Sequence, residues 1–485
     1  MYKAMNLIFK ALIFCSYLVS QSVAPEIHED EPDSTKNTPE VTIGENGEKE
    51  KEKDKSKLKS FEEMIEEFEI LSGVFDIYRH EKDNKAYLAV HPDQYGEIYL
   101  WNMTRQSGDA AYFDSGSMMG EFPFYFISVG KEIQVIEVNT KYRADEGTPT
   151  ALAIKKQLPN SILLNTKILS EPDTLNGKIL VDMNDLFITD KFTLVSYITG
   201  RMKRKYSFDK NNSYFTSMKS FPEYMEIGVA LHYKSEKPYR STTLADSRSM
   251  LHHYHYSITS IPETEYEPRI ADDRVGHFQT FFQDYSDLNS ITPYKYFINR
   301  WHLVKKDSDA ELSEPVKPIV FWIENTTPEK YRNAVARGIL MWNEAFERIG
   351  FLNAIEARIM PDDADWDPAD ARYNTVRWII QPGGGYAVGP SRANPFTGEL
   401  YDADIRVSSD YVRHFYREYG EFVTPVSTED VFSWMDSEDI VGETNDHQCE
   451  YSSEKHRQIA FASNYLNAMG SMKKEDIEEF AMAGL

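Results

Sequence analysis

Residues 319–360 read IVFWIENTTPEKYRNAVARGILMWNEAFERIGFLNAIEARIM, and this stretch decides the fold of the C-terminal part of the chain. Thr327 is a good helix N-cap, Pro328 suits the first helical position, and Gly350 suits the position just past a helix end. We therefore expect one helix over 327–349. Its apolar stripe recurs at helical spacing and consists of Tyr331, Val335, Ile339, Trp342, Phe346 and Ile349.

Short apolar runs on both sides of this helix predict β-strands. They lie at residues 301–304, 319–323, 355–360, 375–381 and 404–407. A strand, a helix and then more strands predict an α/β layer whose sheet packs one face against the helix.

The preceding part of the chain, from Gly73 to Asp287, has a different pattern. A short helical stretch, 61–71, is followed by β-type runs at 87–90, 98–101, 122–129, 133–138, 179–183, 192–198, 224–233 and 252–261. Eight or more strands with few helices predict a sandwich or an open barrel. The fold class is therefore α+β, with a β-rich N-terminal domain over 60–299 and an α/β subdomain over 300–485.

The first 24 residues are typical of a secretory signal peptide. Lys3 and Lys10 give a positive start, residues 11–19 form a short apolar core, and Ser22 and Ala24 are small residues at a cleavage site. Lys10 interrupts the apolar run, which is too short for a membrane anchor. We expect a secreted, periplasmic or extracellular protein with no stable membrane insertion after cleavage.

Residues 25–59 are predicted to be a disordered charged spacer. The segment contains no aromatic residue, and glutamate or aspartate alternates with lysine over 48–55. Such a composition cannot bury enough apolar surface to offset the entropy of ordering.

The net charge and the two cysteines limit which partners and which cysteine chemistry we expect for this protein. The net charge of −25 excludes nucleic acid as an expected partner, because phosphate binding needs a basic surface. Cys15 falls within the signal peptide, so Cys449 has no partner for an intrachain disulfide. We interpret Cys449 as a partly buried lone thiol, with a nucleophile as the alternative.

The densest group of histidines is His252-His253-Tyr254-His255. In a strand, His253 and His255 share one face and could both contact a metal ion. No third ligand stands at a nearby spacing, so the alternative interpretation is a polar strand face.

A second candidate site is acidic. Asp363, Asp365 and Asp367 place carboxylates at alternate positions, and hard oxygen ligands suit Ca²⁺. Pro368 and Asn374 break the EF-hand pattern at positions that need glycine and a bidentate glutamate. The alternatives are a calcium site and a solvated acidic loop whose carboxylates cap a turn.

Complete catalytic motifs are absent from the sequence. It contains no Gly-x-Ser-x-Gly elbow, no Walker-type loop and no His-Glu-x-x-His. Gly383-Gly384-Gly385 is not followed by a helix, so we interpret it as a tight turn and not as a phosphate cradle. No catalytic residue and no zinc ligand is therefore assigned.

A set of stretches nevertheless resembles a known family. They are PRIADDRVG (268–276), NRW (299–301), EPVKPIVFWIEN (314–325), GILMWNEAFERIGF (338–351), NAI (353–355), DWDP (365–368), RYN (372–374), GPSR (389–392) and GELYDADI (398–405). Together they are similar to the large secreted bacterial zinc-dependent metalloproteases with an EcxA-type zinc-binding domain, which are metzincin-like. The resemblance covers most of the mature chain.

The resemblance implies a metzincin-like peptidase subdomain, in which 327–349 is the first long helix. It also implies that Ala387, Val388, Gly389 and Ser391 belong to an edge strand along which a peptide substrate lies. In the complete family, two histidines and a glutamate of His-Glu-x-x-His, with a later histidine, bind Zn²⁺ and activate water for peptide-bond hydrolysis. Those zinc ligands are absent here.

The last residues of the sequence suggest a reason why the zinc ligands are absent. Ile459, Ala462, Leu466 and Met469 predict a helix, and a second apolar stripe runs over 477–485 to the last residue. We interpret Leu485 as the end of a truncated product or an incomplete gene model. The function expected is that of a zinc-metalloprotease-family protein lacking its zinc helix and therefore inactive. The alternative is a non-catalytic secreted module that binds peptides or proteins.

Overall fold

The computed structural model describes residues 58–423, except 192, 262 and 263. These described residues belong to one compact unit, which begins at Leu58. Lys59, the last residue of the predicted spacer, forms a β-bridge with Ser170.

Several sequence predictions lie outside the described residues. They are the signal peptide, residues 25–57 of the spacer, Cys449 and the two helices predicted between 459 and 485. These remain predictions.

The β-rich part contains two large antiparallel sheets. The eight-stranded sheet has the order β10-β12-β13-β4-β5-β6-β8, with β11 paired to β12, and the four-stranded sheet has the order β1-β2-β3-β9. The strands of the first are β4 (Tyr99–Ser107), β5 (Ser117–Val129), β6 (Glu132–Glu137), β8 (Ser161–Lys167), β10 (Ser207–Phe208), β11 (Tyr214–Phe221), β12 (Tyr224–Lys234) and β13 (Ser249–Ser260). Those of the second are β1 (Glu69–Leu71), β2 (Asp76–His80), β3 (Lys85–Val90) and β9 (Ile179–Asp182).

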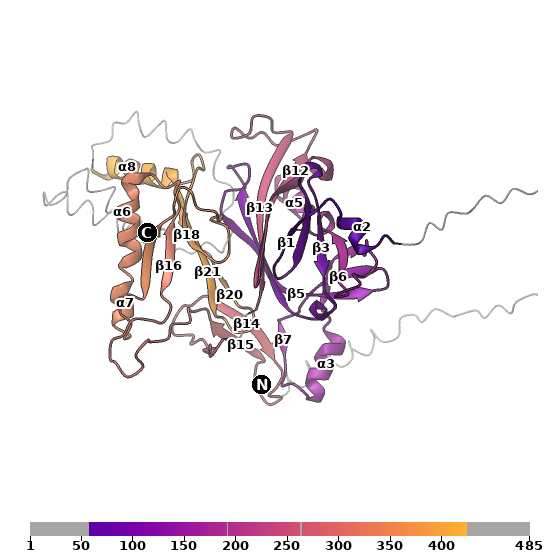
Figure 1. Cartoon of the computed structure of the whole chain (residues 1–485). Helices are drawn as coiled ribbons and strands as arrows, with labels where there is room; N and C mark the ends of the chain where they lie inside the picture. Colours follow the sequence, from indigo (N-terminus) through magenta and orange to yellow (C-terminus); the bar gives the residue numbers. More distant parts are fainter. Residues whose placement is uncertain (1–57, 192, 262–263, 424–485) are drawn as a thin grey trace, which may run out of the picture. The chain divides into compact units, whose positions relative to one another are not determined.

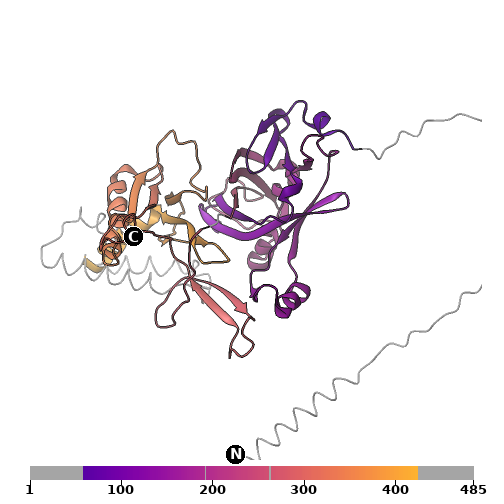
Figure 2. The same ribbon diagram turned by 60° about the horizontal axis from the view of Figure 1, so that its bottom comes forward.

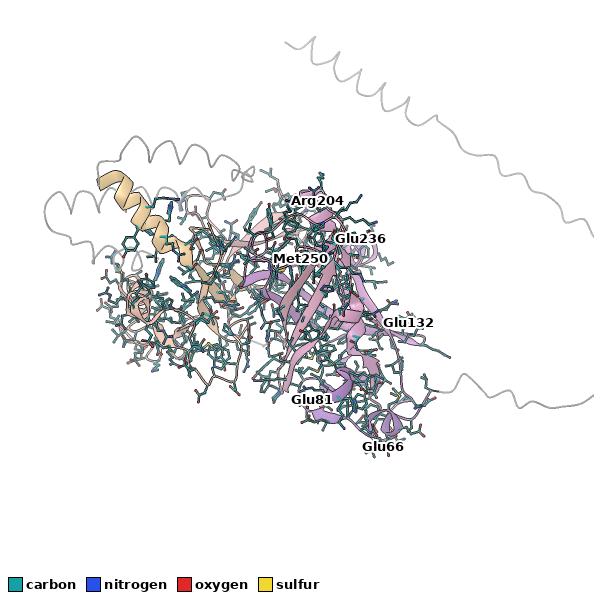
Figure 3. All side chains as sticks on the ribbon, turned by 90° about the horizontal axis from the view of Figure 1, so that it is seen from above. Glu66, Glu81, Glu132, Arg204, Glu236 and Met250 are labelled. Atoms are coloured by element: carbon teal, nitrogen blue, oxygen red, sulfur yellow. The ribbon has the colours of Figure 1, made fainter. Side chains whose placement is uncertain are left out.

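The two sheets share one apolar core. Leu88 of β3 and Phe124 of β5 both belong to it, and Trp101 stacks on Phe187 within it. Figure 3 shows Met250, which is fully buried, in contrast with Glu132 at the periphery. The prediction of a β-rich N-terminal part with few helices is confirmed.

The helices of the β-rich part are short, and two of the predictions for this part differ from the structure. They are α2 (Phe61–Ile65), α3 (Pro149–Gln157), α4 (Met183–Phe187) and α5 (Leu194–Met202), with 3₁₀ turns at η2 (Glu81–Asp83), η3 (Pro92–Gln94) and η4 (Lys210–Asn212). The helix predicted over 61–71 ends at Ile65, and β1 follows. The strand predicted over 192–198 is wrong, because Asp190 accepts the backbone N–H groups of Leu194 and Val195 and starts α5 there.

A third sheet, of order β15-β14-β7, connects the two halves of the chain. It consists of β7 (Tyr142–Arg143), β14 (Gln279–Asp284) and β15 (Tyr294–Ile298). Figure 2 shows β14 and β15 as a hairpin apart from the large sheets. Arg143 holds it to the C-terminal part by donating to the carbonyls of Pro395 and Phe396 at 2.7 Å each.

The C-terminal sheet has the order β17-β16-β18-β21-β19, with β20 also paired to β21. Its strands are β16 (Ile319–Ile323), β17 (Ile355–Ile359), β18 (Asn374–Ile379), β19 (Ala387–Val388), β20 (Ser391–Ala393) and β21 (Leu400–Ser408). The first four in this order are parallel, whereas β19 and β20 run antiparallel to β21. The helices are α6 (Glu329–Leu340), α7 (Asn343–Glu347) and α8 (Ser409–Val423), and Figure 1 shows α6 against the sheet.

The helix predicted over 327–349 is present but broken. A turn at Met341 and Trp342 separates α6 from α7, and Pro328, not Thr327, is the N-cap residue. Gly350 has φ +90°, as a helix-ending glycine requires. Trp342 at the break is 63% exposed and Ile349 is 65% exposed, so neither belongs to the buried stripe.

Residues 301–304 do not form the predicted strand, although the carbonyl of Val304 accepts from the N–H of Val316 at 2.8 Å. No helix in the described part of the chain is long and apolar enough to cross a membrane.

Candidate functional site

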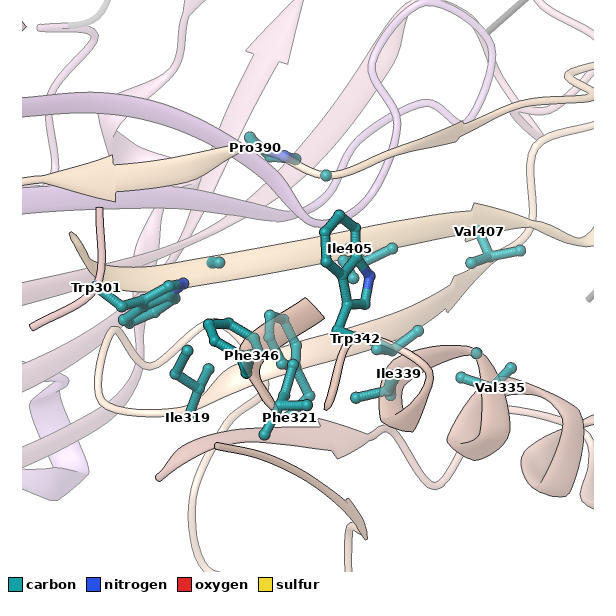
Figure 4. Close-up of a pocket in the computed structure, with 15 residues that line it drawn as sticks. Trp301, Ile319, Phe321, Val335, Ile339, Trp342, Phe346, Pro390, Ile405 and Val407 are labelled. Carbon is teal, nitrogen blue, oxygen red and sulfur yellow. The ribbon is translucent and has the colours of Figure 1, made fainter. Parts of the chain in front are cut away.

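An apolar cavity of about 370 Å³ lies between α6 and the C-terminal sheet. Figure 4 shows Phe321 and Ile405 of the sheet facing Ile339 of α6 across it. Strand alternation explains this lining, because residues two apart on a strand share a face. The sheet therefore presents one apolar face to the helices.

The edge of the cavity is formed by Gly389 and Pro390, which connect β19 to β20. Trp342, on the turn between α6 and α7, also lines the cavity, and Figure 4 shows its ring beside Ile405. An exposed tryptophan beside an apolar cavity offers a contact surface to an incoming side chain.

The four residues of the predicted edge strand lie where the sheet ends. Ala387 and Val388 form β19, the last strand in the sheet order, and Gly389 follows directly. Ser391 belongs to β20 and pairs with Ala403 of β21. Val388 and Gly389 are exposed.

The hydrogen bonds between this edge and β21 show which main-chain groups of the edge do not bond to β21. Tyr386 accepts from the N–H of Ser408, and Pro390 accepts from the N–H of Asp404. In an antiparallel pair, inward-facing and outward-facing residues alternate. The N–H and C=O groups of Ala387 and Gly389 therefore point away from the sheet.

The absent side chain at 389 matters for the cavity. A Cβ built on Gly389 would contact Ile405 at 3.5 Å, and Ile405 lines the cavity. A residue of an added strand directly opposite Gly389 would point its side chain to that same face. Gly389 thus leaves space there.

The opposite face of the same sheet is polar and buried. Asp402, Asp404 and Arg406 alternate along β21 with the cavity-lining residues, and each is at most 8% exposed. Arg392 of β20 is 1% exposed and donates to Asp402 at 2.7 Å. These residues pack against the β-rich part, since Arg392 also donates to the carbonyl of Met103 in β4.

A loop after β4 carries the central carboxylate of this interface, Asp114. Its Oδ1 accepts from Arg105 at 2.9 Å, and its Oδ2 accepts from Arg406 and from the Tyr386 hydroxyl. Burial opposes ionisation, but Arg406, the Tyr386 hydrogen bond and Arg105 hold the pKa of Asp114 below its usual range. Asp114 therefore links the two halves as a carboxylate.

Sequence reasoning missed this polar interface. The signal was present as charges at every second position, 402, 404 and 406, between apolar residues. In isolation such alternation predicts a solvated strand face. Only the packing of β4 and the Asp114 loop over that face makes these charges buried.

The three histidines of β13 lie in three different environments. His252 faces the core, and burial lowers its pKa to about 3. Nδ1 of His253 lies 2.8 Å from the Ser107 hydroxyl. Nε2 of His255 lies 2.7 Å from Glu226, which raises the pKa of His255 although burial opposes this.

The acidic loop between β17 and β18 contacts the β-rich part. The carboxylate of Asp367 accepts from Gln106 and, at 2.8 Å, from the N–H of Ala369, so it caps a turn. Lys219 donates to the carbonyl of Asp365. The calcium site at Asp363, Asp365 and Asp367 stays a prediction.

Within the described residues, no three histidine, cysteine, aspartate or glutamate side chains are arranged to hold a metal ion. The ligand set that zinc requires is therefore not found in this part of the chain.

Comparison with known proteins identifies one domain. Residues 116–306 match the model of a domain of unknown function, DUF5117. This region begins at the end of the Asp114 loop and ends before β16. No curated protein and no solved structure matches the chain.

Proposed function

We propose that the C-terminal sheet binds an extended peptide along β19, as part of a secreted protein of the zinc-dependent metalloprotease type. The outward main-chain groups of Ala387 and Gly389 carry this proposal. An unpaired strand edge binds extended peptide by main-chain hydrogen bonds, and adjacent pockets select side chains.

The arrangement beside the edge supports a preference for apolar side chains. A peptide residue opposite Gly389 would direct its side chain toward the cavity bounded by Ile405 and Trp342. Burial of one leucine-sized side chain is favourable by about 1.5–3 kcal/mol. We therefore propose peptides with an apolar residue at that position as ligands.

The proposal concerns peptide binding and does not include catalysis. In the complete family, zinc supplies activated water for peptide-bond hydrolysis. The described residues do not fit zinc, and the 485-residue sequence contains no His-Glu-x-x-His. We assign no hydrolytic step to these residues, and we propose binding without cleavage for this chain.

The alternative function is a non-catalytic secreted module that binds peptides or proteins. Both proposals share the edge strand and differ in whether zinc chemistry accompanies it. Neither involves nucleic acid, given the net charge of −25. A secreted location and a peptide or protein partner belong to both.

Binding is tested with a fluorescein-labelled heptapeptide that has a central leucine. Its fluorescence anisotropy is titrated with the 485-residue chain and with two variants at one position. Gly389→Pro removes the outward N–H and should weaken binding about tenfold, the effect of one lost hydrogen bond. Gly389→Ala keeps the N–H and adds only a Cβ, which would lie 3.5 Å from Ile405, so a loss of binding in Gly389→Pro beyond that in Gly389→Ala reports the N–H itself.

Equal binding by Gly389→Pro and the unmodified chain would contradict an edge-strand site. A fluorogenic protein substrate, with and without added Zn²⁺, tests cleavage. Hydrolysis by the purified chain would overturn the proposal of binding without catalysis, whereas binding without hydrolysis supports it.

A further inference from the structure

The hairpin of β14 and β15 has one buried face and one exposed face. On the buried face, the ring of Phe282 is covered by the guanidinium of Arg143, which lies 3.7 Å from the ring centre. Arg143 also donates to the carbonyls of Pro395 and Phe396. The hairpin is therefore anchored through this face, and its exposed face belongs to a fixed element of the structure.

The exposed face is aromatic. Phe281 of β14 and Tyr296 of β15 are directly paired, and their ring centres are 6.2 Å apart. Tyr294 lies two residues closer to the loop on the same face, with its ring centre 6.5 Å from that of Tyr296. All three residues are at least 40% exposed. Contiguous exposed apolar surface of this kind marks an interaction site.

The loop between the two strands, residues 285–293, carries the most exposed apolar side chains of the hairpin. Leu288 is 77% exposed, and Ile291 is fully exposed. The loop also satisfies part of its own polar main chain, because the carboxylate of Asp287 accepts from the N–H of Asn289 at 2.9 Å. Paired polar groups cost less to remove from water than unpaired ones do. The loop can therefore present its two aliphatic side chains to an apolar medium.

The order of side chains along the hairpin favours a lipid surface as that medium. The aliphatic Leu288 and Ile291 lie at the loop end, Tyr294 follows, and Phe281 and Tyr296 lie next along the strands. Aliphatic side chains suit the hydrocarbon of a bilayer, whereas tyrosine is enriched at the level of the headgroups. In Figure 2 the hairpin extends away from the large sheets, as an inserting element must. A sugar ligand fits less well, because the outermost side chains offer neither an aromatic ring nor a hydrogen bond.

The charge of the hairpin indicates which type of lipid it meets. Residues 279–298 contain Asp284, Asp287 and a single basic residue, Lys295, within a chain of net charge −25. Anionic lipids attract basic segments and therefore disfavour this one. A zwitterionic headgroup such as phosphocholine exposes its ammonium group, which attracts a carboxylate such as that of Asp287.

We propose that the loop end of this hairpin enters the surface of a zwitterionic phospholipid membrane. Leu288 and Ile291 reach the acyl chains, and Tyr294 lies among the headgroups. The contact is peripheral and reversible, because it buries two aliphatic side chains and no membrane-spanning element. It is separate from the peptide site proposed at β19 and does not depend on it.

Flotation with lipid vesicles tests this contact. The 485-residue chain should bind vesicles of phosphatidylcholine, and it should bind more weakly when they also contain phosphatidylglycerol. Ile291→Ser should lower the partition coefficient about tenfold, because it removes one aliphatic side chain from the membrane. The matched control is Leu175→Ser, at a 92% exposed leucine in the loop before β9, and it should bind like the unmodified chain. An equal loss in both variants, or stronger binding to the anionic vesicles, would overturn the proposal.

Hydrogen–deuterium exchange locates the contact, whichever other segment also touches the vesicles. Phosphatidylcholine vesicles should slow exchange over residues 285–293 of the unmodified chain, and slowing confined to other residues would contradict the site. Analytical ultracentrifugation tests a second copy of this chain as the partner. Dimerisation that Ile291→Ser abolishes, without vesicle binding, would overturn the membrane proposal. Ile291→Ser should bind the leucine heptapeptide with unchanged Kd, so a failure here is distinguishable from a failure of the peptide site.

Discussion

The guanidinium of Arg392 donates to the carbonyl of Met103 at 2.8 Å, across 289 positions of sequence. The same side chain, 1% exposed, donates to Asp402 at 2.7 Å. One buried arginine thus joins β20, β21 and β4. The polar face of the C-terminal sheet is consequently an internal surface, which packs against the β-rich part.

Removal of this arginine should destabilise both halves together. Arg392→Met leaves Asp402 buried without its partner, and we expect a loss of about 3–5 kcal/mol in the free energy of unfolding. Urea unfolding followed by tryptophan fluorescence measures this loss. The double variant Arg392→Met/Asp402→Leu removes both charges and should recover part of it. A double variant no more stable than the single one would contradict the ion-pair explanation.

Close packing of the Asp114 loop predicts that alanine substitutions at two glycines differ in their cost to stability. Both Gly116 and Gly130 have positive φ, +72° and +61°. Gly116→Ala also places a Cβ at 3.0 Å from Arg406, whereas a Cβ at Gly130 meets nothing within 4 Å. We expect Gly130→Ala to cost about 1 kcal/mol and Gly116→Ala about 2–3 kcal/mol. Thermal unfolding of the two variants side by side measures the difference, and equal losses would exclude the contact.

The contribution of Asp114 to stability should depend on pH. Its folded-state pKa is lowered, so the stabilisation is complete above the unfolded-state pKa near 3.8 and is lost as pH falls through the folded-state value. The stability difference between the unmodified chain and Asp114→Asn should therefore be large at pH 6 and shrink below about pH 4. Denaturant titrations of both proteins from pH 6 to pH 3 measure it. A difference that stays constant over this range would show that Asp114 does not act as a carboxylate.

Trp342 should affect peptide binding but not folding. Its side chain is 63% exposed beside the cavity, so Trp342→Ala removes contact surface for a ligand and little core packing. We expect the Kd of the leucine heptapeptide to rise about tenfold, as for an aromatic contact at an interface. The Tm should stay within about 1 °C, because surface substitutions usually change stability by less than about 0.5 kcal/mol. The matched control is Met341→Ala, 60% exposed on the same turn but outside the cavity lining. Unchanged affinity in Trp342→Ala would remove the cavity from the proposed site.

Local patterns predicted the regular elements well where burial follows a simple period. The run 224–233 corresponds to β12 (Tyr224–Lys234), and 355–360 corresponds to β17 (Ile355–Ile359). The positive φ of Gly350 was also predictable, because only glycine adopts it easily at a helix end. The strand predicted over 192–198 was wrong. One side chain, Asp190, accepts the N–H groups at the start of a helix there, and this outweighs the β-propensity of the residues in the run.

The sequence by itself determined the β-rich N-terminal part, the helix packed on the C-terminal sheet and the glycine at the sheet edge. Each depends on neighbours in the chain, through side-chain period or backbone conformation. Only the tertiary structure decided that Arg377, Arg392 and Arg406 are buried and that Asp114 contacts Tyr386 and Arg406 from a distant segment. An alternating strand has two faces, and its sequence does not show what packs against each. Burial of those charges depends on contacts across hundreds of residues, such as Arg392 with Met103 and Arg406 with Asp114, which no local pattern encodes.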